Sequence, residues 1–170
     1  LAESLALGIP FLKWNVPIPR VVGIVETEIH ESMLGVRLDQ MFPHGHPPTN
    51  LHFLASSAMR EFRKAKSIPK KLAFIQLWAE QQGIEVLILD TVNDFFRGED
   101  NPNQETDAGT FFDIIRNMDM KFKLLVRHDR KHAGMAGYAL PSSNEMIRGS
   151  AEWKEDPELI LYLNRADKRT

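Results

Sequence analysis

Carboxylates stand directly after two apolar segments of this sequence. Glu26 and Glu28 follow the run Arg20–Val25, and Asp90 ends the run Ile84–Asp90. A strand held rigidly in a core can use a terminal carboxylate to bind Mg²⁺ or a magnesium-bound water. A second carboxylate on a neighbouring strand can polarise a water for attack on a phosphate. The pattern therefore predicts a site with Asp90 as metal ligand and Glu28 beside an attacking water.

A basic cluster follows a third apolar segment, Phe122–Val126, where the sequence reads Arg127-His128-Asp129-Arg130-Lys131. A histidine or cation at this place is suited to contact a terminal phosphate. Each residue alone also fits a plain structural role. Asp90 could cap the next loop, Glu28 could be a solvated turn residue, and His128 could be a structural histidine.

Apolar strand patterns alternate with helical patterns along the chain, which predicts an α/β fold. Most of the strand segments are apolar on both faces, which is typical of a mostly parallel sheet covered by helices on both sides. The carboxyl ends of such strands meet at one edge, where ligands bind. The expected strands are Arg20–Val25, Leu51–Leu54, Ile84–Asp90, Phe122–Val126 and Leu159–Leu163, and the expected helices are Leu1–Leu7, Glu31–Met41, Ile68–Gln82 and Thr106–Met120.

Length and composition narrow the class of protein. The 170 residues, 43% of them hydrophobic, predict a single domain over residues 1–170 with a substantial core. No apolar run reaches the roughly 20 residues that a membrane helix needs. The chain has no cysteine, which excludes disulfides and thiolate zinc sites and fits a cytoplasmic location. A net charge of −2 excludes a uniformly basic nucleic-acid binder but leaves room for a local basic patch.

Two segments could supply such a patch. The run Arg60–Lys71 is strongly basic and would either contact phosphates or form a solvated helix face. The glycine-containing segment Arg130–Asn144 is expected to be a long loop, and Arg130, Lys131 and Tyr138 could contact phosphates and stack on bases there.

Five segments in order carry a resemblance to a known family. The chain resembles RecA-like, AAA-type P-loop ATPases of the group that includes plasmid and phage hexameric replicative helicases. The matching segments are Ile9–Trp14 (similar to P-F-L-G-W), Arg20–Ile29 (similar to R-V-L-Y-I-D-G-E-M), Val86–Asp90 (the Walker B strand), Val126–Lys131 (similar to V-H-H-T-R-K) and Ile147–Ala151 (similar to R-G-S-S-A).

The resemblance implies a role for each candidate residue. Glu28 would orient or activate the attacking water, Asp90 would hold magnesium through water, and His128 would sense the γ-phosphate. Arg148 would reach a neighbouring subunit's nucleotide as an arginine finger, or be an ordinary loop arginine. Lys131 would be a second basic contact to the nucleotide, or a solvated loop lysine. The implied cofactors are ATP and Mg²⁺, and the implied partners are single-stranded DNA and further copies of the chain in a ring.

The sequence also departs from the family pattern. The phosphate-binding motif G-x-x-x-x-G-K-[ST] is absent, and Leu1 already stands in a helical pattern. We therefore expect the chain to be truncated just after that motif, without the first strand and the P-loop, and to stop early at Thr170. Arg127 replaces the first histidine of the family's pair, and Pro157-Glu158 replaces an Ala-Asp pair.

Three functions follow from these observations. The first is magnesium-dependent ATP hydrolysis coupled to a DNA transaction such as replicative helicase activity. The second is a RecA-like regulatory module that binds nucleotide or DNA without turnover. The third is a fragment that is inactive by itself because the residues that grip the β- and γ-phosphates are missing. Measured turnover separates the first from the others, and nucleotide binding without turnover indicates the second.

Overall fold

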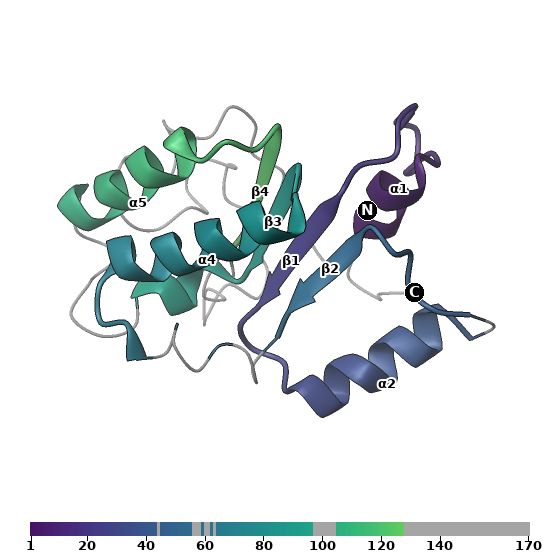
Figure 1. Ribbon diagram of the computed structural model, residues 1–170, viewed down its shortest axis with the longest axis horizontal. Coiled ribbons are helices and arrows are strands. Elements are labelled where there is room, and N and C mark those ends of the chain that lie inside the picture. Colours follow the sequence, from purple (N-terminus) through teal and green to yellow (C-terminus); the bar gives the residue numbers. More distant parts are fainter. Residues whose placement is uncertain (44, 56–58, 60–61, 63, 97–104, 128–170) are drawn as a thin grey trace, which may run out of the picture.

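Four parallel strands form a sheet in the order β2-β1-β3-β4 (Figure 1). This computed structural model describes residues 1–43, 45–55, 59, 62, 64–96 and 105–127. No helix among them is long and apolar enough to cross a membrane. The elements are α1 (Ala2–Leu7), β1 (Val22–Glu26), α2 (Glu31–Met41), β2 (Leu51–Leu54), α4 (Ile68–Gln82), β3 (Val86–Asp90), the 3₁₀ turn η1 (Val92–Phe96), α5 (Glu105–Asn117) and β4 (Phe122–Val126).

The sequence predicted this architecture closely. The α/β fold with a parallel sheet is confirmed, and four of the expected strands are present with bounds within two residues. The helix expected over Thr106–Met120 ends earlier, at Asn117, because the chain turns at Met118 to enter β4. The strand expected over Leu159–Leu163 lies outside the described residues.

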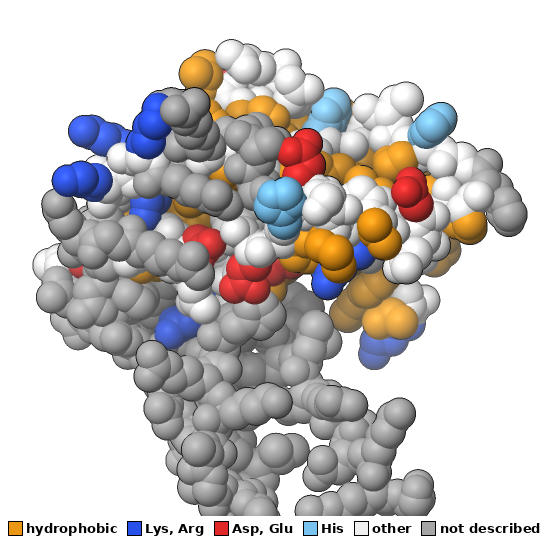
Figure 2. All heavy atoms as spheres, turned by 90° about the horizontal axis from the view of Figure 1, so that it is seen from below, with side chains coloured by type: hydrophobic (Ala, Val, Ile, Leu, Met, Phe, Trp, Pro, Cys, Tyr) orange, Lys and Arg blue, Asp and Glu red, His pale blue; other side chains and the backbone are white. Residues whose placement is uncertain are grey.

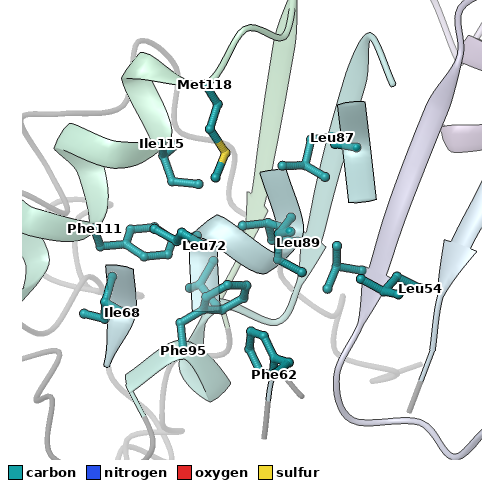
Figure 3. Close-up of a cluster of buried hydrophobic side chains, with 14 of the residues drawn as sticks. Leu54, Phe62, Ile68, Leu72, Leu87, Leu89, Phe95, Phe111, Ile115 and Met118 are labelled. Atoms are coloured by element: carbon teal, nitrogen blue, oxygen red, sulfur yellow. The ribbon is translucent and has the colours of Figure 1, made fainter. Parts of the chain in front are cut away.

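Each face of the sheet carries its own apolar layer. Helices α4 and α5 pack on one face, where Phe95 and Phe111 are fully buried and meet edge to face with ring centroids 5.6 Å apart (Figure 3). On the opposite face Ala6 of α1 packs with Val22 of β1. Alternate residues of β1 serve the two layers, as the pleat of a strand requires.

Helix α4 approaches β1 closely at Gly23. A Cβ atom built on Gly23 would lie 2.9 Å from a ring carbon of Trp78 and 3.0 Å from a methyl carbon of Ile84. A glycine at this position therefore leaves the space that the Trp78 ring fills.

Helix α2 contains no buried residue. Its bounds are those predicted, and His30 caps it by accepting a hydrogen bond from the Ser32 N–H. Met33 and Met41, which share one face of the helix, are 54% and 56% exposed.

A carboxylate joins three strands at the amino edge of the sheet. Glu85, just before β3, accepts hydrogen bonds from the Arg20 guanidinium at 3.1 Å and the Val21 N–H at 3.2 Å, both just before β1. It also accepts one from the Lys121 ammonium, just before β4. These contacts lower the pKa of Glu85 from 4.5 to about 2, with Lys121 the largest cause.

This cluster predicts a defined pH dependence of stability. A carboxylate whose pKa falls on folding stabilises the native state above its unfolded pKa, and the stabilisation disappears as the pH falls through the folded value. Glu85→Gln should therefore lower the melting temperature at pH 7, and the gap to the wild type should close between pH 4.5 and about 2. Thermal unfolding across this range measures the gap, with Glu80→Gln on an exposed part of α4 as control. A gap that is constant with pH would contradict the assignment.

Lys71 is buried, although the basic run Arg60–Lys71 was predicted to contact phosphates or to form a solvated helix face. It is 2% exposed, and its ammonium donates to the backbone carbonyls of Asp94 at 3.2 Å and Phe95 at 2.7 Å. The ammonium also lies 5.7 Å from the centroid of the Phe62 ring. Lys71 therefore holds the η1 turn that follows β3, whereas its neighbour Lys70 is exposed.

Replacement of Lys71 tests this role. Lys71→Met should lower the free energy of unfolding by about 2 kcal/mol, because two buried carbonyls lose a charged donor. Lys70→Met on the exposed side should change it by less than about 0.5 kcal/mol. Urea unfolding of both variants measures the difference, and equal effects would show that Lys71 does not support the turn.

Candidate functional site

The carboxyl ends of β1 and β3 lie side by side at one edge of the sheet. The two strands pair in parallel from Val22 opposite Val86 to Glu26 opposite Asp90. Two acidic residues thus occupy matching positions in neighbouring strands. Figure 2 views the molecule from below, the side toward which the arrowheads of β1 and β2 point in Figure 1. In Figure 2, acidic side chains lie near the middle of this face, and basic side chains lie at several places around them.

Glu26 is buried despite its charge, with 7% of its surface exposed. Its Oε1 atom accepts hydrogen bonds from the backbone N–H groups of Glu28 at 2.9 Å and Ile29 at 3.0 Å. Backbone donors of this kind compensate a carboxylate for the loss of water. Glu26 therefore fixes the first turn of the loop that leaves β1.

Thr27 ties the same loop to the end of β3. Its N–H donates to the Asp90 carbonyl at 2.9 Å, and its Oγ1 accepts a hydrogen bond from the Thr91 N–H at 3.1 Å. Thr27 and Thr91 are both buried, at 8% and 0% exposure. The pairing thus continues one residue beyond Glu26, through one backbone hydrogen bond and one hydrogen bond to a side chain.

The two carboxylates predicted from the sequence lie at this edge. Asp90 is the last residue of β3 and is half-buried, and Glu28 stands two residues after the end of β1 and is exposed. The η1 turn follows Asp90 almost at once, and Lys71 holds it from α4. Both candidates therefore sit on backbone that packing and hydrogen bonds restrain.

The donor set at this edge suits a hard cation that shares its ligands with a phosphate. Among the residues that the structure describes, no three histidine, cysteine or acidic side chains gather closely enough to hold a metal ion. Mg²⁺ in phosphate-processing sites is usually held by one or two carboxylates, with water and phosphate oxygens completing the shell. Asp90, which is half-buried at the end of β3, is the candidate ligand at this edge.

The sequence placed Glu26 at the end of the first strand but gave it no role, and it did not single out Thr27. The Glu26 carboxylate accepts a hydrogen bond from a backbone N–H of the next turn. The Thr27 hydroxyl accepts one from the backbone N–H of Thr91, which is more than sixty residues away in the sequence. The one available signal was the position of Glu26 at the end of an apolar strand, directly before a turn, where carboxylates often bind local N–H groups.

Three other predicted site residues, His128, Lys131 and Arg148, lie outside the described residues. The same holds for the expected loop Arg130–Asn144. Their expected roles stay predictions. Of the basic run, Lys64, Lys66 and Lys70 are described and exposed.

A pocket of about 410 Å³ lies away from the strand-end site. It is lined by Gln76, Ala79, Glu80, Gly83, Ile84, Asp119 and Met120. These residues belong to the end of α4 and to the segments before β3 and β4. The pocket therefore opens near the amino ends of the strands, opposite the edge that carries Asp90.

Comparison with known proteins gives one match. A family model described as an AAA domain matches residues 1–134, which is most of the chain. Neither the curated proteins nor the solved structures contain a match. The matched span includes the whole described sheet and both carboxylate candidates. The chain therefore belongs to this AAA domain family, whose members are nucleotide-binding domains of the ATPase type.

Proposed function

We propose that the protein hydrolyses ATP with Mg²⁺ and couples this reaction to a DNA transaction, such as replicative helicase activity in a plasmid or phage. The observation that carries the proposal is the pairing of β1 with β3. It brings the acidic ends of two strands to one edge in a chain that belongs to an AAA domain family. The further resemblance to replicative helicases supports the DNA part of the proposal.

In this proposal, Glu28 and Asp90 divide the chemistry between them. Glu28 orients the attacking water and accepts its proton as the water oxygen bonds to the γ-phosphorus. The bond from this phosphorus to the β–γ bridging oxygen breaks, and ADP is the leaving group. Asp90 binds magnesium through a water, and a bound magnesium ion supplies charge neutralisation on the phosphate oxygens. Glu28 sits on an exposed loop, where a water and the nucleotide can reach it.

The remaining roles follow from the resemblance alone. His128 would contact the γ-phosphate and respond to its loss, and Lys131 would add a second positive charge beside the nucleotide. Arg148 would reach the nucleotide of a neighbouring copy in a ring, where a guanidinium suits the charge of the transition state. For single-stranded DNA, the exposed Lys64, Lys66 and Lys70 offer one cationic surface.

ATP turnover by the protein as its gene encodes it tests this function. The wild type should hydrolyse ATP only with Mg²⁺, and single-stranded DNA should change the rate. Glu28→Gln should lower kcat about 100-fold or more, as expected for loss of a general base. Asp90→Ala should abolish the turnover that the wild type shows with Mg²⁺. Glu31→Gln, at the exposed first turn of α2, is the matched control and should stay near the wild-type rate.

Two outcomes would contradict the proposal. One is a wild type without turnover, and the other is unchanged turnover in both variants. Nucleotide binding without hydrolysis, retained in Glu28→Gln, would instead indicate a regulatory module.

We further propose that the 170-residue chain alone binds ATP weakly and does not hydrolyse it. Most phosphate contacts in P-loop ATPases come from the backbone of G-x-x-x-x-G-K-[ST], and this sequence contains no such motif. Isothermal titration of this chain with Mg-ATP should give no measurable heat at micromolar concentrations. A micromolar dissociation constant would overturn this expectation.

A further inference from the structure

The loop that carries Glu28 starts from a buried acid. Glu26 is 7% exposed, and a single oxygen atom, Oε1, accepts the N–H groups of both Glu28 and Ile29, at 2.9 Å and 3.0 Å. The two donors are the backbone groups of the proposed catalytic residue and of its neighbour. Any rotation of the peptide between Thr27 and Glu28 would break the first of these bonds.

The same loop is also fixed against the neighbouring strand. The Thr27 N–H donates to the Asp90 carbonyl, and the Thr27 hydroxyl accepts from the Thr91 N–H. Asp90 is the proposed magnesium ligand. Thr27, which directly precedes Glu28, therefore links the backbone at Glu28 to the backbone at Asp90. The Cα of Glu28 is therefore restrained from both sides, by Glu26 within its own loop and by Thr27 across the sheet.

We propose that Glu26 and Thr27 are positioning residues, which hold Glu28 in register with Asp90 during catalysis. The inference rests on the proposed ATPase function and adds two residues to it. In this assignment Glu26 acts as a hydrogen-bond acceptor and does not exchange protons with the substrate water. Its burial and its two backbone partners suit this role, whereas the exposed Glu28 is placed to meet solvent.

Substitution can distinguish a positioning role of Glu26 from a role as general base. Because both hydrogen bonds end on one oxygen, the amide oxygen of glutamine can also accept both of them, although more weakly than a carboxylate oxygen does. Glu26→Gln should therefore retain the loop, and Glu26→Ala should release it. For a general base the same exchange has the opposite result, since an amide cannot take up the proton of the water.

The experiment measures steady-state ATP hydrolysis by Glu26→Gln, Glu26→Ala and Glu28→Gln in the protein as its gene encodes it. Glu26→Gln should keep kcat within about threefold of the wild type. Glu26→Ala should lower kcat about 10- to 100-fold, the range expected from small displacements of a catalytic group, while the KM for ATP stays within about twofold. A Glu26→Gln variant as inactive as Glu28→Gln would overturn the proposal and make Glu26 itself the base.

Hydrogen exchange gives a second readout that needs no activity. The amides of Glu28 and Ile29 should exchange faster in Glu26→Ala than in the wild type and at a nearly unchanged rate in Glu26→Gln. Unchanged exchange in Glu26→Ala would refute the positioning role. A wild type without ATPase activity would remove the proposed function, yet the exchange result would still decide whether Glu26 fixes this loop.

Substitution of Thr27 covers the case in which Glu26→Ala does not fold. Thr27→Ser keeps the hydroxyl and should retain kcat, whereas Thr27→Val has nearly the same volume but no acceptor for the Thr91 N–H. Thr27→Val should lower kcat at least about tenfold with little change in KM. Equal rates in the two variants would show that the link to β3 does not position Glu28.

Discussion

Val22 to Glu26 pair residue for residue with Val86 to Asp90, and the remainder of the molecule depends on this alignment. In a sheet with both faces covered, a shift of one residue would move every side chain of a strand to the opposite layer. The alignment is fixed at both ends by polar contacts. Glu85 binds the start of β1 at the amino edge, and Thr27 binds the end of β3 at the carboxyl edge. Each contact consists of only a few hydrogen bonds, but both oppose a shift of β1 along β3.

The polar contacts at the two edges have different electrostatic character. Glu85 meets two cations and a backbone N–H near solvent, where water and salt screen charges. Glu26 and Thr27 are buried and rely on backbone donors and acceptors. The amino edge is therefore held by charged partners and the carboxyl edge by backbone groups. This division suits a fold that carries its candidate chemistry at the carboxyl edge.

The sequence predicted the sheet well because its strands are continuous apolar runs between turn residues. Leu51–Leu54 and Phe122–Val126 have the expected bounds, and Asp90 ends its strand as expected. The pattern predicted less about partners distant in sequence. Lys71 reads as part of a charged face until the fold brings the carbonyls of Asp94 and Phe95 to it. Likewise, the apolar spacing that puts Met33 and Met41 on one face of α2 does not reveal their exposure, because burial depends on what covers the helix and none of its residues is buried.

Trp78 and Lys71 give α4 two attachments seven residues apart, which is about 10 Å along a helix. The ring of Trp78 lies over Gly23 near the start of β1, and the ammonium of Lys71 holds the turn beyond the end of β3. A helix attached at two such points can neither roll about its axis nor tilt without losing one of them. Helix α4 is therefore held to β1 by packing and to the turn after β3 by hydrogen bonds, so a shift of the helix that relieves one contact would strain the other.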